Sequence, residues 1–87
     1  MKHITLDYIL QLRNFILEKT EEIEHYQRVV AAIRAGYKHM TKAELETAVA
    51  DVRWMEEQIQ KHKEWCADAQ VVINDFYKPA TDTRLIA

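Results

Sequence analysis

Apolar residues recur at alternating steps of three and four along two long stretches of the chain. In the first stretch these positions are Ile9, Leu12, Ile16, Lys19, Ile23, Tyr26, Val30 and Ile33. In the second they are Leu45, Ala48, Val52, Met55, Ile59, His62, Cys66, Ala69, Ile73 and Phe76. This spacing keeps side chains on one stripe of an α-helix. We therefore predict an all-α fold, an antiparallel hairpin of two coiled-coil-like helices at about residues 5–35 and 41–77.

Local signals support these helix limits. Thr5 can cap the first helix, and Gly36, the single glycine, predicts a left-handed stop at its end. Thr41 and Glu44 have the spacing of a capping box at the start of the second helix. Pro79 disfavours helical geometry just before it, so the second helix should end near residue 77.

The length of 87 residues predicts one domain. We assign residues 1–78 to a single helical-hairpin domain and residues 79–87 to a non-helical tail, which could dock through Leu85 and Ile86. Aligning the two stripes antiparallel predicts that Leu12 lies beside Cys66.

The first half of the first helix is more apolar than one stripe requires. Its extra apolar residues flank the stripe, Tyr8 and Phe15 on one side and Leu6, Leu10 and Leu17 on the other. A helix that is apolar nearly all round is buried nearly all round, and one partner helix cannot cover it. The end of the second helix, which lies alongside, adds Trp65 and Val72.

This surplus predicts a homodimer, or a higher oligomer, packed as a four-helix bundle at the open end of the hairpin. The predicted interface consists of Tyr8, Leu10, Phe15, Leu17, Trp65 and Val72. Two alternatives remain. A foreign protein could use the same surface, or the chain ends could fold over it in a monomer.

A basic and aromatic cluster marks the turn. Its members are Arg34, Tyr37, Lys38, His39 and Lys42. Basic residues with aromatic neighbours can hold an anion, a nucleotide or a nucleic acid. Cations in the last turn of a helix also suit its dipole, so a plain solvated tip is the simpler interpretation. Trp54 lies off the stripe, where it would be exposed, and is a candidate hot spot for a partner.

Three polar patterns resemble ligand sites, but packing explains each more simply. His62 and Cys66 are four residues apart, yet two ligands are too few for a closed zinc site. Glu22 and His25 have the Glu-x-x-His spacing of di-iron bundles, but His25 should face solvent. Lys19 can extend its stem along the seam and keep its ammonium in water, or grip an anionic ligand. We predict no metal and no cofactor.

Catalytic motifs are scarce. The chain has one glycine, one cysteine and no serine, which removes phosphate-binding glycine loops and serine hydrolases. The net charge of −2 gives no general attraction to nucleic acid. No stretch approaches the roughly 20 apolar residues that cross a membrane, and no signal peptide is recognisable, so we expect a cytoplasmic protein without membrane contact.

The sequence therefore predicts a small, non-enzymatic helical protein that associates with itself. Its expected role is to bind another macromolecule as an adaptor, regulator or inhibitor, of the kind found among phage and mobile-element accessory proteins. The alternative is an anion or nucleotide binder that uses the basic turn. A nucleic-acid binder that uses the same turn is the third hypothesis.

Overall fold

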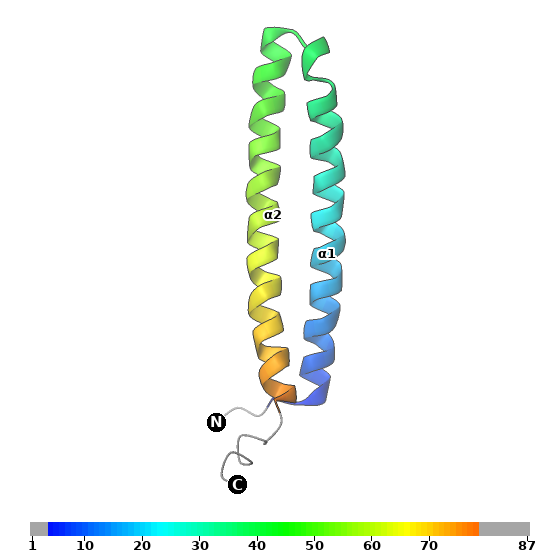
Figure 1. The fold of residues 1–87 in the computed structure, drawn as a ribbon, viewed down its shortest axis with the longest axis vertical. Coiled ribbons are helices and arrows are strands. Elements are labelled where there is room, and N and C mark those ends of the chain that lie inside the picture. The colour runs from blue at the N-terminus through cyan, green and yellow to red at the C-terminus, as the bar shows by residue number, and fades with distance from the viewer. Residues whose placement is uncertain (1–3, 79–87) are drawn as a thin grey trace.

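The computed structural model describes residues 4–78, which form two long helices side by side (Figure 1). Helix α1 spans Leu6–Ala35, a short 3-10 helix η1 spans Tyr37–His39, and helix α2 spans Lys42–Tyr77. The two long helices run antiparallel, with η1 at one end of the hairpin and the start of α1 and the end of α2 at the other. The predicted all-α hairpin is confirmed. The predicted tail at residues 79–87 lies outside the described residues.

Side-chain caps fix where the helices begin. The Thr5 hydroxyl accepts a hydrogen bond from the Tyr8 amide at 3.2 Å at the start of α1. At the start of α2, the Glu44 amide donates to the Thr41 hydroxyl at 3.2 Å, and the Thr41 amide donates to the Glu44 carboxylate at 2.9 Å. These contacts satisfy amides that a helix leaves without a partner, so the predicted capping box is confirmed.

Gly36 ends α1 differently from the prediction. Its φ of −93° and ψ of −4° lie in the right-handed region, so the predicted left-handed stop is wrong. The chain does not reverse at this residue but continues into η1. The His39 amide donates to the Gly36 carbonyl oxygen at 3.0 Å, and the Met40 amide donates to that of Tyr37 at 3.1 Å. Because these bonds extend the same hand of helix, the backbone needs no positive φ here.

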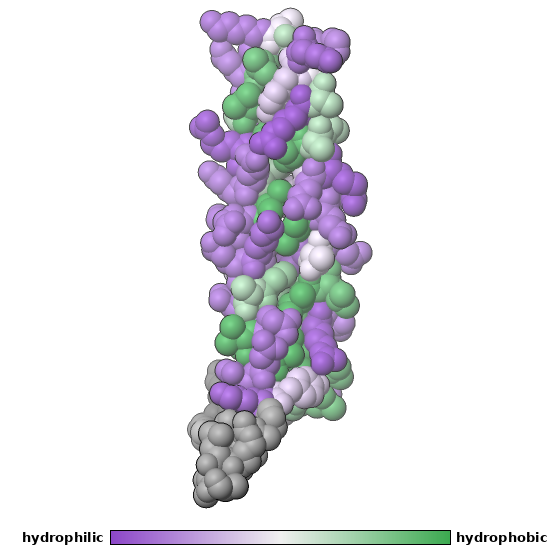
Figure 2. All heavy atoms as spheres, viewed as in Figure 1, coloured by the Kyte–Doolittle hydropathy of each residue, from purple (hydrophilic) through white to green (hydrophobic). Residues whose placement is uncertain are grey.

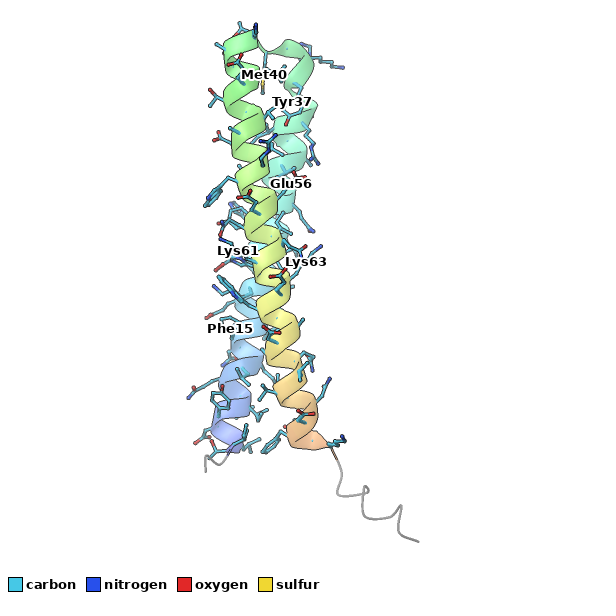
Figure 3. All side chains as sticks on the ribbon, turned by 90° about the vertical axis from the view of Figure 1, so that its left-hand side faces the viewer. Phe15, Tyr37, Met40, Glu56, Lys61 and Lys63 are labelled. Carbon is cyan, nitrogen blue, oxygen red and sulfur yellow. The ribbon has the colours of Figure 1, made fainter. Side chains whose placement is uncertain are left out.

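The seam between the helices holds the predicted stripe residues. All of them are buried or half-buried except Phe76, which is 36% exposed. The most buried members are Ile9, Val30, Ala48, Val52, Ala69, Ile73 and the polar His62. Ile9 is fully enclosed. The helices cross at a shallow angle, as the two perpendicular views show (Figures 1 and 3).

The register of the two helices differs from the predicted one. The Cys66 thiol lies 3.9 Å from the carbonyl oxygen of Ile16, one helical turn beyond the predicted neighbour Leu12. The 3-10 helix η1 explains the shift, because it extends the arm that α1 begins before the chain crosses to α2 (Figure 1). The pairing of residues along the seam moves accordingly.

Candidate functional site

Large apolar side chains remain exposed at the open end of the hairpin, opposite η1. Their exposed fractions range from 36% to 62%, and they are Ile4, Leu6, Tyr8, Leu10, Leu17, Trp65, Val71, Phe76 and Tyr77. Figure 2 shows apolar surface on both helices near this end and a narrower apolar strip along the seam toward the turn. Scattered apolar residues are normal on a protein surface, but a concentration of this kind marks an interaction site.

The apolar side chains that flank the stripe of α1 lie on two sides of this helix. Tyr8 and Phe15 are seven residues apart and share one side, and Leu10 and Leu17 share another. Because a helix turns about 100° per residue, the step from Tyr8 to Leu10 rotates the side chain by about 200°. The six predicted interface residues therefore do not form one surface. We call Tyr8, Phe15, Trp65 and Val72 the aromatic face, and Leu6, Leu10 and Leu17 the leucine face.

The aromatic face contains an open groove of about 270 Å³ between the two helices. It is lined by Tyr8, Leu12, Phe15, Trp65, Asp68, Ala69 and Val72. Its lining is apolar apart from Asp68. In Figure 3, Phe15 of α1 and Lys61 of α2 lie on one side of the hairpin, whereas Glu56 and Lys63 of α2 lie on the other side. A groove of this composition can accept apolar side chains, and it offers one carboxylate for a polar contact.

A polar cluster with one buried member, His62, crosses the seam beside this groove. His62 is only 5% exposed, and its Nε2 lies 2.7 Å from Glu22 Oε2. Its Nδ1 lies 2.7 Å from the carbonyl oxygen of Gln58. Each ring nitrogen of His62 therefore lies within hydrogen-bond distance of an oxygen acceptor of the protein. The hydrogen bond from His62, with help from the Lys19 ammonium 3.4 Å away, lowers the pKa of Glu22.

The contacts of this cluster bear on the two candidate ligand pairs, His62 with Cys66 and Glu22 with His25. Both ring nitrogens of His62 lie 2.7 Å from protein acceptors, so neither is open to a metal that would bind together with Cys66. Glu22 turns toward α2 and His62 instead of pairing with His25, which is exposed. The pairing of Glu22 with His62 was missed by sequence reasoning. The polar residue in the second stripe signalled it, but the partner could be found only with the correct register.

Lys19 lies at the edge of the seam, half-buried, as its place in the stripe predicts. Its ammonium lies 5.5 Å from the centre of the Phe15 ring and 5.6 Å from that of Trp65. A cation over aromatic faces is stabilised by the ring quadrupoles. Lys19 therefore connects the polar cluster to the aromatic face. Its ammonium interacts with the Phe15 and Trp65 rings and with the Glu22 carboxylate.

A row of aromatic contacts extends the aromatic face toward the middle of the hairpin. The Tyr26 ring packs edge-on against Trp54 with 5.9 Å between ring centres, and against His62 at 6.0 Å. His62 in turn lies 5.2 Å from the Trp65 ring. Trp54, the candidate hot spot, is 53% exposed at the end of this row.

The basic residues at the turn are only partly brought together. The Arg34 guanidinium pairs with the carboxylate of Glu56 on α2, away from the tip. Lys38, His39 and Lys42 are exposed, and Tyr37 is half-buried. A groove of about 350 Å³ lies beside the Arg34 pair and is lined by Gln27, Val30, Ala31, Arg34, Glu56 and Ile59. Because Glu56 neutralises Arg34, this groove offers no net positive charge to an anion.

Within residues 4–78, the structure contains no group of three histidine, cysteine or acidic side chains arranged to hold a metal ion. In the same residues, neither long helix has a continuous apolar segment sufficient to cross a membrane. Comparisons with protein-family models, with curated proteins and with solved structures find no match.

Proposed function

We propose that this protein is a self-associating helical hairpin that works by binding another macromolecule, as an adaptor, regulator or inhibitor, and not by catalysis. The observation that carries this proposal is the concentration of exposed apolar side chains at the open end. Apart from Phe76, which belongs to the stripe, a two-helix seam does not need these residues, because the seam itself is filled by the other stripe residues. Burial against another protein would remove these exposed apolar side chains from water and so explain their presence.

The aromatic face fits a second copy of the chain. In a symmetric dimer the same face is used on both subunits, and each residue contributes twice. Tyr8 and Trp65 are each 45% exposed, so each leaves about 100 Å² open, worth about 2–3 kcal/mol on burial. Over two copies this approaches the association cost of about 4–15 kcal/mol, and the half-buried Phe15 and Val72 add to it.

A matched pair of charge substitutions tests this dimer. Tyr8→Glu places a carboxylate in the aromatic face, whereas Asn14→Glu places one on the exposed side of the same helix. We expect Tyr8→Glu to remain helical by circular dichroism and to sediment as a monomer. Asn14→Glu should associate as the unmodified chain does. If the folded Tyr8→Glu protein associates as strongly as Asn14→Glu, the aromatic face is not the interface.

The alternative function is anion or nucleotide binding at the turn, and a nucleic-acid site there is the third candidate. Three exposed basic residues favour it, namely Lys38, His39 and Lys42. The ion pair between Arg34 and Glu56 weakens it, because it removes one cation from the site. Thermal stabilisation by ATP that is lost in the Lys38→Glu, Lys42→Glu double variant would favour a ligand site. Binding to DNA that weakens steeply with salt would favour a nucleic-acid site.

A further inference from the structure

The leucine face continues a second regular stripe along α1. Leu6, Leu10, Arg13 and Leu17 follow one another at steps of four, three and four. The three leucines are 54%, 46% and 62% exposed, so this stripe does not pack against α2. Steps of this kind are those of a coiled-coil seam, in which side chains insert between those of a facing helix. The geometry therefore points to a helical occupant along about 16 Å of α1.

Acidic residues border this stripe. Asp7 lies three residues before Leu10, and Glu21 and Glu24 lie four and seven residues after Leu17, on the same side of α1. Within the described residues, none of these three carboxylates forms an ion pair. The one cation of the stripe is Arg13, and its guanidinium lies over the Tyr77 ring, 5.2 Å from its centre. The border is therefore negative and uncompensated.

The negative charge of this border distinguishes between two occupants of the leucine face, a second copy of the chain and a helix of another protein. A second copy of the chain would bring the same three carboxylates against this face, and like charges at close range suppress pairing. A parallel pairing of two α1 helices would also place Arg13 against Arg13. A helix with apolar residues at the same steps and lysine or arginine beside them would meet both the leucines and the carboxylates.

We infer that the leucine face binds a basic amphipathic helix of a partner protein, while the aromatic face serves self-association. The inference rests on the proposed function and names the class of its macromolecular partner. It assigns separate roles to the two apolar faces, which lie on different sides of α1.

A pair of designed peptides tests this assignment. Both peptides have about 20 residues with leucine at alternating steps of three and four, and their flanking positions carry lysine in one and glutamate in the other. Each is labelled with a fluorophore and titrated with the full chain while anisotropy is recorded. We expect the lysine peptide to bind about tenfold or more tightly than the glutamate peptide. Equal binding of the two peptides, or binding of neither, would overturn the inference.

Substitutions in the chain locate the binding. Leu10→Gln with Leu17→Gln keeps every charge and replaces exposed leucines by a residue that favours helix, so the hairpin should fold normally. We expect this variant to lose about tenfold or more in affinity for the lysine peptide. Glu21→Gln with Glu24→Gln should weaken binding and reduce its dependence on salt. Unchanged affinity in the leucine variant would mean non-specific attraction only, and would reject the site.

The Tyr8→Glu variant separates this inference from the proposed dimer. It should bind the lysine peptide as the unmodified chain does, because Tyr8 lies on the other face. Binding to the peptide by a chain that is always monomeric would support the leucine face and reject self-association. A dimer that ignores both peptides would retain self-association and reject the basic partner.

Discussion

The two halves of the hairpin use their apolar residues differently. Toward the turn, each helix buries one stripe, with Val30, Ala48 and Val52 between 4% and 8% exposed. Among the described residues of this half, Val49 and Trp54 are the large hydrophobic residues left exposed. Toward the open end, Ile9 and Ile73 are buried as well, but nine further large apolar residues remain open. A hairpin needs only the first arrangement, so the surplus in the second supports the proposed contact with other protein.

The polar cluster of Lys19, Glu22 and His62 lies between the two halves. A polar residue in a helical seam can fix the register, because any slip leaves its hydrogen bonds unsatisfied. His62 meets acceptors on both helices, the Gln58 carbonyl on α2 and the Glu22 carboxylate on α1. The turn half and the open half are thus held in one alignment by this cluster.

The largest expected effect is on the free energy of unfolding, and it differs between buried and exposed apolar residues of the open half. Ile9→Ala removes a fully enclosed side chain and should lower the free energy of unfolding by about 2–5 kcal/mol. Leu17→Ala removes a side chain that is 62% exposed and should change it by about 0.5 kcal/mol or less. Urea unfolding of dilute protein measures both. Similar losses would mean that Leu17 is buried by this chain itself.

The next effect concerns the turn half, where α2 begins. Thr41→Ala removes the side chain that accepts from the Glu44 amide and should cost about 1 kcal/mol in unfolding free energy. Thr47→Ala makes the same chemical change inside α2, where Thr47 bonds only to the Ala43 carbonyl. Because alanine favours helix more than threonine, this control should be neutral or slightly stabilising. Equal losses in both variants would contradict the role of the cap.

A smaller and opposite effect is expected at Gly36. Its backbone is right-handed, and an added Cβ would lie 3.5 Å from the Ile33 carbonyl oxygen and 3.6 Å from the Met40 methyl group, which are ordinary contacts. Gly36→Ala should therefore raise the thermal midpoint, with a gain of about 0.4–1 kcal/mol, by restricting the unfolded chain. A clear loss of stability would instead indicate the left-handed geometry that the sequence suggested.

The smallest expected effect is the pH dependence of the stability that Glu22 contributes at the boundary between the two halves. The pKa of Glu22 is lowered from 4.5 in the folded protein, so its carboxylate stabilises the fold above that pH. This contribution disappears as pH falls through the folded pKa. In urea unfolding, the unmodified chain should exceed Glu22→Gln in stability near neutral pH, and the difference should shrink on acidification below pH 4.5. A difference that does not vary with pH would contradict the ion pair.

The sequence was sufficient for the helices and their seam. The capping residues Thr5 and Thr41 and the residue before Pro79 mark local events, and local chemistry sets the helix limits. The geometry of the connection was not predictable in the same way. Whether Gly36 reverses the chain depends on the hydrogen bonds of η1, and these determine how far α2 is displaced along α1.

The candidate site was predicted in content but not in arrangement. The spacing of apolar residues around the stripe identifies the surplus. The sequence prediction nevertheless places Tyr8 and Leu10 in one interface, although they point to different sides of α1. The contact between Glu22 and His62 depends on register and so could not be read from spacing within one helix. Arg34 was grouped with the turn, but its reach toward Glu56 is a contact between helices.

The central claim is that the open end carries apolar surface that other protein covers, beginning with a second copy of the chain. Sedimentation equilibrium of the unmodified chain over a wide concentration range tests it most directly. The account predicts an apparent mass that rises from 10.3 kDa at low concentration toward twice that value. A mass that stays at 10.3 kDa throughout, with Tyr8 and Trp65 still accessible to solvent, would contradict it.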